Sequence, residues 1–325
     1  MRHQIFDGQS NEPPGGALGA RSGATPDARQ AQIRRRRTVA GASALLLVLL
    51  LIAVSSGGGS SSRPKSDPAQ AAAQIHGRGL AGIVPPPPDV PFGGITAQED
   101  AAINRVMSYT PTVVQGGSQR REVALTFDDG PSTYTPEILS VLEREHVPAT
   151  FFQIGQQSRM YPDLGTTELR EGFPVENHTR THPFLARLSP QEQKGEITDA
   201  SAAIVSFGGP PPRLFRPPYG SYDSATLRIL REQRMLNILW TVDTRDFAQP
   251  GVDRIVMTAL SGAVPGAIIL MHDGGGPRTQ EPLALPRIIR GLRERHFRLV
   301  TVPQMMLEDP PGAGQAVPRG LSGVG

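Results

Sequence analysis

The feature that most limits the fold of this chain is a regular alternation of short apolar runs with helical patterns, beginning near Glu122. The apolar runs predict seven strands: Val123–Asp128, Ala149–Ile154, Phe173–Asn177, Leu214–Arg216, Ile238–Asp243, Ala267–His272 and Leu299–Val302. Nearly continuous apolar runs are typical of parallel strands that are buried on both faces. Because helical patterns separate them, we expect parallel βαβ units, and about seven parallel strands suit a distorted (β/α) barrel.

Helical periodicity predicts the segments between these strands. The patterns cover residues 135–146, 189–207, 222–233, 252–263 and 282–297. A further short helix is expected at 96–110, where Thr96 is the cap and Glu99 lies three residues later. Strands and helices together account for residues 120–307, which we interpret as one α/β domain.

A membrane anchor is predicted ahead of this domain. The uncharged, leucine-rich stretch 38–56 is about as long as a bilayer-spanning helix. Four arginines, Arg34 to Arg37, precede it and place residues 1–37 in the cytoplasm by the positive-inside rule. The alternative is a cleaved signal peptide with a site near Ala53–Ser55. The leader is long for a signal peptide, so a single-pass anchor with an extracellular α/β domain is favoured.

Composition divides the rest of the chain. Residues 1–37 are polar and lack any period, which indicates disorder. Residues 57–119 form a linker rich in Gly, Ser and Pro that includes the short helix, and 308–325 form a loose Pro/Gly-rich tail. The net charge of +3 arises in residues 1–37, so the folded part offers no basic face for nucleic acid. Cysteine is absent, so any metal must be held by His, Asp or Glu.

Polar residues concentrate where the predicted strands end. Five of the seven strands run into ionisable or hydrogen-bonding blocks: Asp128–Asp129, "NHTRTHP", "RPPYG", "DTRDF" and "MHDGG". In a parallel barrel the carboxyl ends of the strands form the active-site face. One polar strand end is ordinary turn chemistry, whereas five predict a site.

Each candidate residue also has a structural interpretation. His178 and His182 are four residues apart, which on a helical turn places both imidazoles on one face and with an acid suits zinc. Two surface histidines would give the same spacing. His272 could equally be a buried core histidine, Asp243 a helix cap and Arg216 half of a structural ion pair.

The blocks "TFDDGP", "HTRTH", "RPPYG", "DTRDF" and "LMHD", in this order, resemble the polysaccharide deacetylases of carbohydrate esterase family 4, the NodB homology domain. The similarity covers about Arg120 to Leu307. It implies a distorted (β/α) barrel and metal-dependent removal of N-acetyl groups from N-acetylglucosamine polymers. Hydrolysis of an amide needs a base that takes a proton from water, an acid that protonates the departing amine and a group that polarises the carbonyl. The carboxylates and histidines of the five blocks could supply these groups.

The resemblance assigns roles position by position. Asp129, His178 and His182 would bind a divalent metal, with zinc preferred and cobalt as a substitute. Asp128 would be the general base with Arg216 as charge partner, and His272 the general acid with Asp243 holding its imidazole. The backbone N–H of Tyr219 would stabilise the oxyanion, and Trp240 and Leu270 would wall the pocket for the acetyl methyl group.

Two positions depart from the family pattern. Phe247 stands where the family often has Trp, and Glu176 stands where a small residue is common. Glu176 could bond a neighbouring loop or influence the metal. The expected function is a membrane-anchored deacetylase of cell-wall glycan, foremost peptidoglycan, without nucleic acid as a partner. The alternatives are hydrolysis of O-acetyl esters on xylan or a modified wall sugar, and a non-catalytic glycan-binding domain.

Overall fold

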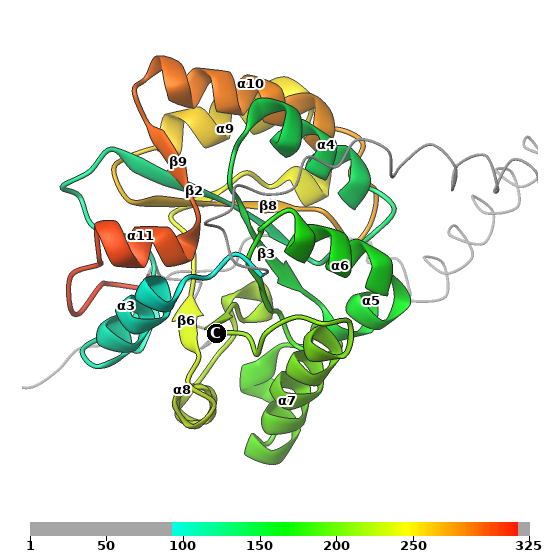
Figure 1. The fold of residues 1–325 in the computed structure, drawn as a ribbon, viewed down its shortest axis with the longest axis vertical. Coiled ribbons are helices and arrows are strands. Elements are labelled where there is room, and N and C mark those ends of the chain that lie inside the picture. The colour runs from blue at the N-terminus through cyan, green and yellow to red at the C-terminus, as the bar shows by residue number, and fades with distance from the viewer. Residues whose placement is uncertain (1–92, 318–325) are drawn as a thin grey trace, which may run out of the picture. The chain divides into compact units, whose positions relative to one another are not determined.

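The computed structural model describes residues 93–317 (Figure 1). The predicted basic segment 1–37, the predicted anchor 38–56 and the first part of the linker lie outside this range, as do residues 318–325 of the tail. Within 93–317, none of the helices has both the length and the apolar character needed to cross a bilayer.

The centre of the fold is a curled parallel sheet of nine strands. They are β1 (Thr112–Val113), β2 (Glu122–Asp128), β3 (Thr150–Gln153), β4 (Val175–Asn177), β5 (Leu214–Phe215), β6 (Leu236–Ile238), β7 (Val242–Asp243), β8 (Ala267–His272) and β9 (Arg298–Val300). The order is β1-β6-β5-β4-β3-β2-β8-β7, with β9 beside β2, and every pair among the described residues is parallel. The predicted parallel α/β fold is therefore confirmed.

The predicted strand Ile238–Asp243 is wrong, because this segment forms two short strands. Leu236 at the start of β6 pairs with β5, and Val242 in β7 pairs with β8. Between them the backbone changes partner: Leu239 N–H donates to the Val113 carbonyl at 2.8 Å, and Thr241 N–H donates to the Ile268 carbonyl at 3.0 Å. One segment thus bridges two edges of the sheet, which distorts the barrel. The pairing partner Thr112–Val113 is too short for periodicity to reveal.

The six predicted helices are confirmed with small shifts at their ends. They are α3 (Ala97–Met107), α4 (Thr135–Glu145), α7 (Pro190–Ser206), α8 (Ser224–Glu232), α9 (Val252–Gly262) and α10 (Glu281–Glu294). The predicted capping box of Thr96 and Glu99 is present at the start of α3. Three helices were not predicted: α5 (Gly155–Met160), α6 (Pro162–Arg170) and α11 (Val302–Glu308). All three are short, and only Tyr161 separates α5 from α6, which begins at Pro162.

The hydrophobic core outside the barrel shows which side chains of β2 and β8 face away from the barrel interior. The outer core lies between β2, β3 and β8 and the helices α4, α9 and α10, which lie together on one side of the sheet (Figure 1). Phe127 and Met271 belong to this outer core. Since successive strand residues point to opposite faces, the next residues, Asp128 and His272, face the barrel interior. Asp128 and His272 are register partners at the ends of β2 and β8.

Candidate active site

The ends of five strands bring the predicted site residues together. Asp128 and His272 end β2 and β8, and Asn177 and Phe215 end β4 and β5, just before His178 and Arg216. β7 supplies the segment that follows Asp243. Because these strands are parallel, their carboxyl ends lie at one edge of the sheet, where a parallel barrel places its active site.

Asp128 forms a buried ion pair with Arg216. Arg216 Nη1 lies 2.7 Å from Asp128 Oδ1 and 2.8 Å from Thr126 Oγ1. The guanidinium is fully buried over the ring of Phe152, with its carbon 4.1 Å from the ring centre. Burial lowers the pKa of Arg216, and the charge and hydrogen bond of Asp128 oppose that shift. The predicted pairing is therefore present, and it balances the charge of one of the two adjacent carboxylates.

Asp129 lies against both histidines. Its backbone leaves the strand with φ 74°, and its Oδ1 lies 3.4 Å from His178 Nε2 and 3.1 Å from His182 Nε2. One ligand atom from each of the three residues lies within 4.8 Å of the others. Burial would raise the pKa of Asp129, but the two adjacent imidazoles hold it well below its ordinary value.

This cluster fits a divalent metal. Two imidazole nitrogens and one carboxylate oxygen are the donor set of open zinc sites. Asp129 Oδ1 is buried and has no geometrically satisfactory hydrogen-bond donor within residues 93–317, so it is free to act as a ligand. Arg278 Nη2 lies 4.0 Å from the other oxygen, Oδ2.

The two histidines do not lie on a helical turn, and that prediction is wrong. They lie in a loop after β4, where Thr179 and His182 adopt left-handed backbone conformations with φ 66° and 64°. Asn177 Oδ1 accepts the Thr179 N–H at 2.9 Å, and Thr179 Oγ1 accepts the His182 N–H at 3.1 Å. Side-chain hydrogen bonds, rather than helical periodicity, therefore hold His178 and His182 on the same side of the loop.

The acid that holds His272 is Asp246, so the prediction of Asp243 is corrected. His272 Nδ1 lies 2.8 Å from Asp246 Oδ1, and the His272 N–H donates to Asp246 Oδ2 at 3.0 Å. Asp243 Oδ1 instead accepts the Arg245 N–H at 2.8 Å. Arg245 is left-handed, with φ 55°, and the 3-10 turn Asp246–Ala248 follows it. This turn brings the second acid of "DTRDF" to the histidine.

Asp246 also sets the protonation of His272. Burial alone would lower the pKa of His272, but the charge and hydrogen bond of Asp246, with smaller contributions from Asp129 and Asp128, raise it to about 9. A histidine with a raised pKa holds a proton near neutral pH, which is the state that a general acid requires.

Several residues near the site were missed by the sequence analysis. Arg278 is 2% exposed and its Nε has no acceptor in the described range. Glu281 at the start of α10 is fully buried, and burial and the negative charge of Asp246 raise its pKa well above the ordinary value. The sequence feature that could have pointed to this segment is the run "HDGGGPR". In the structure its middle glycine, Gly275, approaches the site so closely that a Cβ there would lie 2.3 Å from Asp129 Oδ2. Three glycines in a row indicate a backbone that approaches another group closely.

The remaining predicted residues lie around this centre. Trp240 and Leu270 are buried in one apolar cluster with Phe152, on the same face of the sheet as His272. Phe247 packs edge-on against the His272 ring with the ring centres 5.4 Å apart. Tyr219 lies beside the histidine loop, and its hydroxyl is 3.0 Å from His182 Nδ1.

Glu176 is not part of the metal-ligand cluster. Its Oε2 accepts the backbone N–H groups of Arg213 and Leu214 at 2.8 and 2.7 Å. Burial raises the pKa of Glu176 to about 8, although these two hydrogen bonds oppose the shift. Of the two roles considered for this residue, bonding of a neighbouring loop is the one present.

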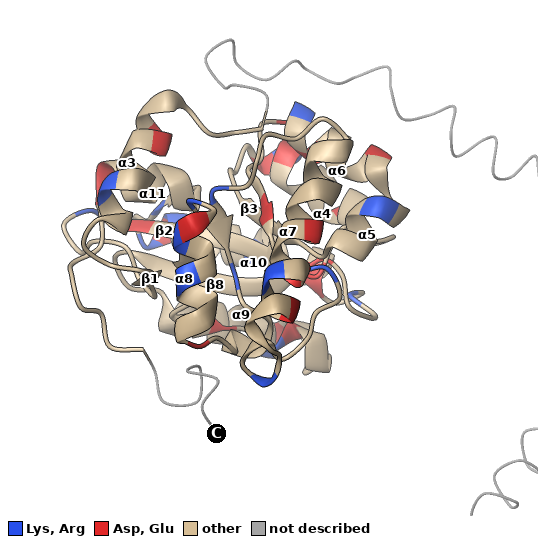
Figure 2. Cartoon of the chain, turned by 90° about the horizontal axis from the view of Figure 1, so that it is seen from below, with Lys and Arg blue, Asp and Glu red and all other residues tan. Residues whose placement is uncertain are grey.

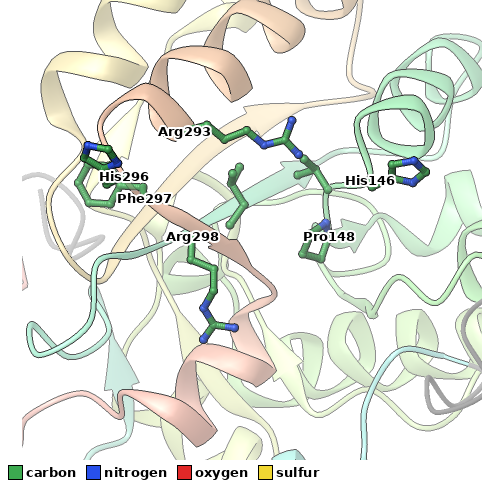
Figure 3. A pocket seen from close by; sticks show the side chains of 8 residues that line it. His146, Pro148, Arg293, His296, Phe297 and Arg298 are labelled. Atoms are coloured by element: carbon green, nitrogen blue, oxygen red, sulfur yellow. The ribbon is translucent and has the colours of Figure 1, made fainter.

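A hollow lies at the opposite ends of the strands from the candidate active site. It is a groove of about 450 Å³ lined by His146, Arg293, His296, Arg298 and neighbouring residues (Figure 3). Arg293 pairs with Glu145, and Arg298 pairs with Glu122 and Glu308. Since its arginines are already neutralised, the groove has little charge to offer a ligand. Figure 2 likewise shows acidic and basic residues interspersed over the described domain, as its near-neutral composition predicts.

Comparison of the chain with known proteins identifies its family. The profile of a family described as polysaccharide deacetylase matches residues 115–237. A chitooligosaccharide deacetylase of Bradyrhizobium sp. (strain ANU 289) is 42% identical over 201 residues, which cover 58% of this chain and 92% of the relative. The chain belongs to the polysaccharide deacetylase family. The resemblance inferred from its five motifs is confirmed.

Two further relatives of this polysaccharide deacetylase share its fold or sequence. A peptidoglycan-N-acetylglucosamine deacetylase of Bacillus cereus is 36% identical over 192 residues, covering 58% of this chain and 70% of the relative. The crystal structure of the Bc1960 peptidoglycan N-acetylglucosamine deacetylase aligns with a TM-score of 0.59 at 34% identity, covering 63% of this chain and 96% of that one. The relatives thus include enzymes named for chitooligosaccharide and enzymes named for peptidoglycan N-acetylglucosamine.

Proposed function

We propose that this protein hydrolyses the N-acetyl groups of N-acetylglucosamine units in a cell-wall polysaccharide, and that its substrate is peptidoglycan. The observation that supports this proposal best is the position of the Asp129, His178 and His182 cluster. It lies beside a buried carboxylate, Asp128, whose register partner at the end of β8 is a histidine with a raised pKa, His272. A base, an acid and a cation site on one edge of a sheet are the groups that amide hydrolysis requires.

Asp128 acts as the general base. Its Oδ1 is held by Arg216 and its Oδ2 lies 3.7 Å from His178 Nε2, so the carboxylate is at the cluster and its orientation is restricted. The positive charge of Arg216 favours the ionised form of this carboxylate, which can then take a proton from water. The two adjacent acids have different partners, which limits their mutual repulsion.

His272 acts as the general acid. Asp246 accepts at Nδ1, so Nε2 is the nitrogen available to give a proton to the departing amine. Protonation of the amine is needed because an unprotonated amine is a poor leaving group. The Phe247 ring covers one side of the imidazole.

A divalent metal would be held by Asp129, His178 and His182, and we propose zinc, with cobalt as a functional substitute. When bound, such an ion polarises a carbonyl group and makes a bound water more acidic. We further propose that the Tyr219 backbone N–H stabilises the oxyanion and that Trp240 and Leu270 enclose the acetyl methyl group. Both side chains are buried and apolar, as such a wall requires.

We propose that the enzyme acts at the outer face of the cytoplasmic membrane. In this arrangement residues 1–37 are cytoplasmic, 38–56 form a single anchor, 57–119 form the linker, 120–307 form the catalytic domain and 308–325 form a tail. The support is the sequence pattern of arginines followed by an apolar stretch. Fractionation of cells that express the full chain should place it in the membrane, and recovery of a soluble, shortened protein would favour signal cleavage.

Acetate release from defined substrates tests the activity. Peptidoglycan, chitooligosaccharides and acetylated xylan are incubated side by side with the wild-type protein and with Asp128→Asn. We expect release from the two N-acetylglucosamine polymers, greatest from peptidoglycan, and almost none with Asp128→Asn. Release from xylan alone would instead identify an ester hydrolase. No release from any substrate by a zinc-loaded protein would favour a glycan-binding domain.

A further inference from the structure

A column of aromatic and cationic side chains lies at the rim of the active site. The guanidinium carbon of Arg187 is 4.5 Å from the centre of the Phe184 ring. Phe184 stacks on Tyr219, with ring centres 3.9 Å apart and planes 13° apart. Tyr219 in turn packs against His182, with ring centres 4.6 Å apart and planes at 69°. The column therefore ends on one of the three residues of the metal-ligand cluster.

This column does not contribute to the hydrophobic cores of the described residues. Phe184 is 41% exposed and Tyr219 is 50% exposed, and neither belongs to a core cluster. Tyr219 also adopts a left-handed backbone conformation, with φ 59°, which is sterically unfavourable for a bulky residue. Exposed aromatic surface and a strained backbone both oppose folding here, and such features persist where they serve a site.

The column reaches the metal-ligand cluster through the contact of Tyr219 with His182. An imidazole that binds a metal through one nitrogen is oriented by the hydrogen bond that its other nitrogen makes. For His178, Nδ1 lies 2.7 Å from the Arg216 carbonyl, which can only accept, so Nδ1 carries the hydrogen and Nε2 presents a lone pair to the cluster. For His182, the corresponding partner is the Tyr219 hydroxyl at 3.0 Å.

We propose that Tyr219 is a positioning residue for the metal: its hydroxyl accepts the Nδ1–H of His182, and stacking on Phe184 keeps that hydroxyl in place. This inference rests on the proposed function, since it concerns the same cluster. It assigns the side chain of Tyr219 a role separate from that of its backbone N–H. The partner of His178 Nδ1 is a main-chain carbonyl, whereas the partner of His182 Nδ1 is a side-chain hydroxyl that a substitution can remove.

Zinc affinity of the purified protein, measured by competition with a chromophoric chelator, tests this role without recourse to activity. Tyr219→Phe keeps the ring and the stack but removes the hydroxyl, and we expect zinc binding to weaken about 10- to 100-fold. Phe184→Ala keeps the hydroxyl but removes the stack, and we expect a smaller loss of about two- to tenfold.

Tyr109→Phe is the matched control, because it removes the same atom from a hydroxyl that donates to the Pro311 carbonyl at 2.9 Å. Its zinc affinity should equal that of wild type. Equal zinc affinity in Tyr219→Phe and wild type would overturn the inference while leaving the proposed function intact. A wild-type protein that binds no zinc but releases acetate would instead overturn the proposed metal site. Circular dichroism identifies a misfolded variant, and Phe184→Ala then tests the role independently.

Discussion

Replacement of Asp246 by Asn should move the alkaline limit of activity to lower pH. Asp246 is the largest cause that raises the pKa of His272 above the value that burial alone would give. A hydrogen bond to a charged group contributes about 1.5–3 kcal/mol, and one pKa unit corresponds to about 1.4 kcal/mol. Asp246→Asn should therefore lower the pKa of His272 by about one to two units.

The direction of the effect follows from the role of His272 as an acid. Its protonated form is required, so activity is retained below its pKa and lost as the pH rises through it. The folded pKa is also raised above the ordinary value, so protonation stabilises the fold fully below about pH 6.5 and this contribution is lost as the pH rises towards about 9. A cation beside Asp129 offsets part of the negative potential there, so the wild-type limit is expected below pH 9.

The assay is kcat/KM for acetate release from a chitooligosaccharide between about pH 6 and pH 10 at saturating zinc, a range that spans the ordinary and raised pKa of histidine. Asp243→Asn is the matched control, because Asp243 bonds the Arg245 N–H and not His272. Asp246→Asn should shift the alkaline limb and lower kcat/KM, whereas Asp243→Asn should shift it much less. An unchanged limb in Asp246→Asn together with a shifted limb in Asp243→Asn would refute the assignment.

Three further predictions follow from the same geometry. Gly275→Ala should weaken zinc binding and acetate release, because its Cβ would lie 2.3 Å from Asp129 Oδ2, whereas Gly314→Ala has a similar φ with open space around it and should leave zinc binding unchanged. Arg216→Met should reduce the free energy of unfolding by about 3–5 kcal/mol in a urea titration, because it leaves Asp128 buried without its partner; a change below about 1 kcal/mol, the range of a surface pair, would contradict this. Removal of metal with a chelator should abolish acetate release and zinc should restore it, so full activity in a zinc-free protein would exclude the proposed chemistry.

Local patterns predicted a large part of the catalytic edge. Asp128 and His272 end two apolar runs whose other residues are needed for the sheet, and strand alternation places both on the interior face. The pairing of Arg216 with Asp128 and the grouping of Asp129 with two histidines also agree with the structure. The strand ends were predictable because strand periodicity depends on neighbouring residues, whereas the partners of Asp128 and Asp129 were implied by the family resemblance.

Loop conformations were not predictable in this way. His178 and His182 have helical spacing, yet side-chain hydrogen bonds from Asn177 and Thr179 hold them in an extended loop with two left-handed residues. Spacing alone is therefore compatible with more than one backbone geometry. The outcome, two imidazoles on one side, is the same, but its physical cause is different.

The sequence by itself determined the parallel α/β architecture and which strand ends carry chemistry, because both follow from patterns a few residues long. Only the tertiary structure decided between Asp243 and Asp246, which depends on the left-handed turn at Arg245 and on the distance to another strand. It also decided that one segment divides into β6 and β7 and that Tyr219 reaches His182. These outcomes depend on contacts between segments far apart in the chain, and local periodicity carries no information about such contacts.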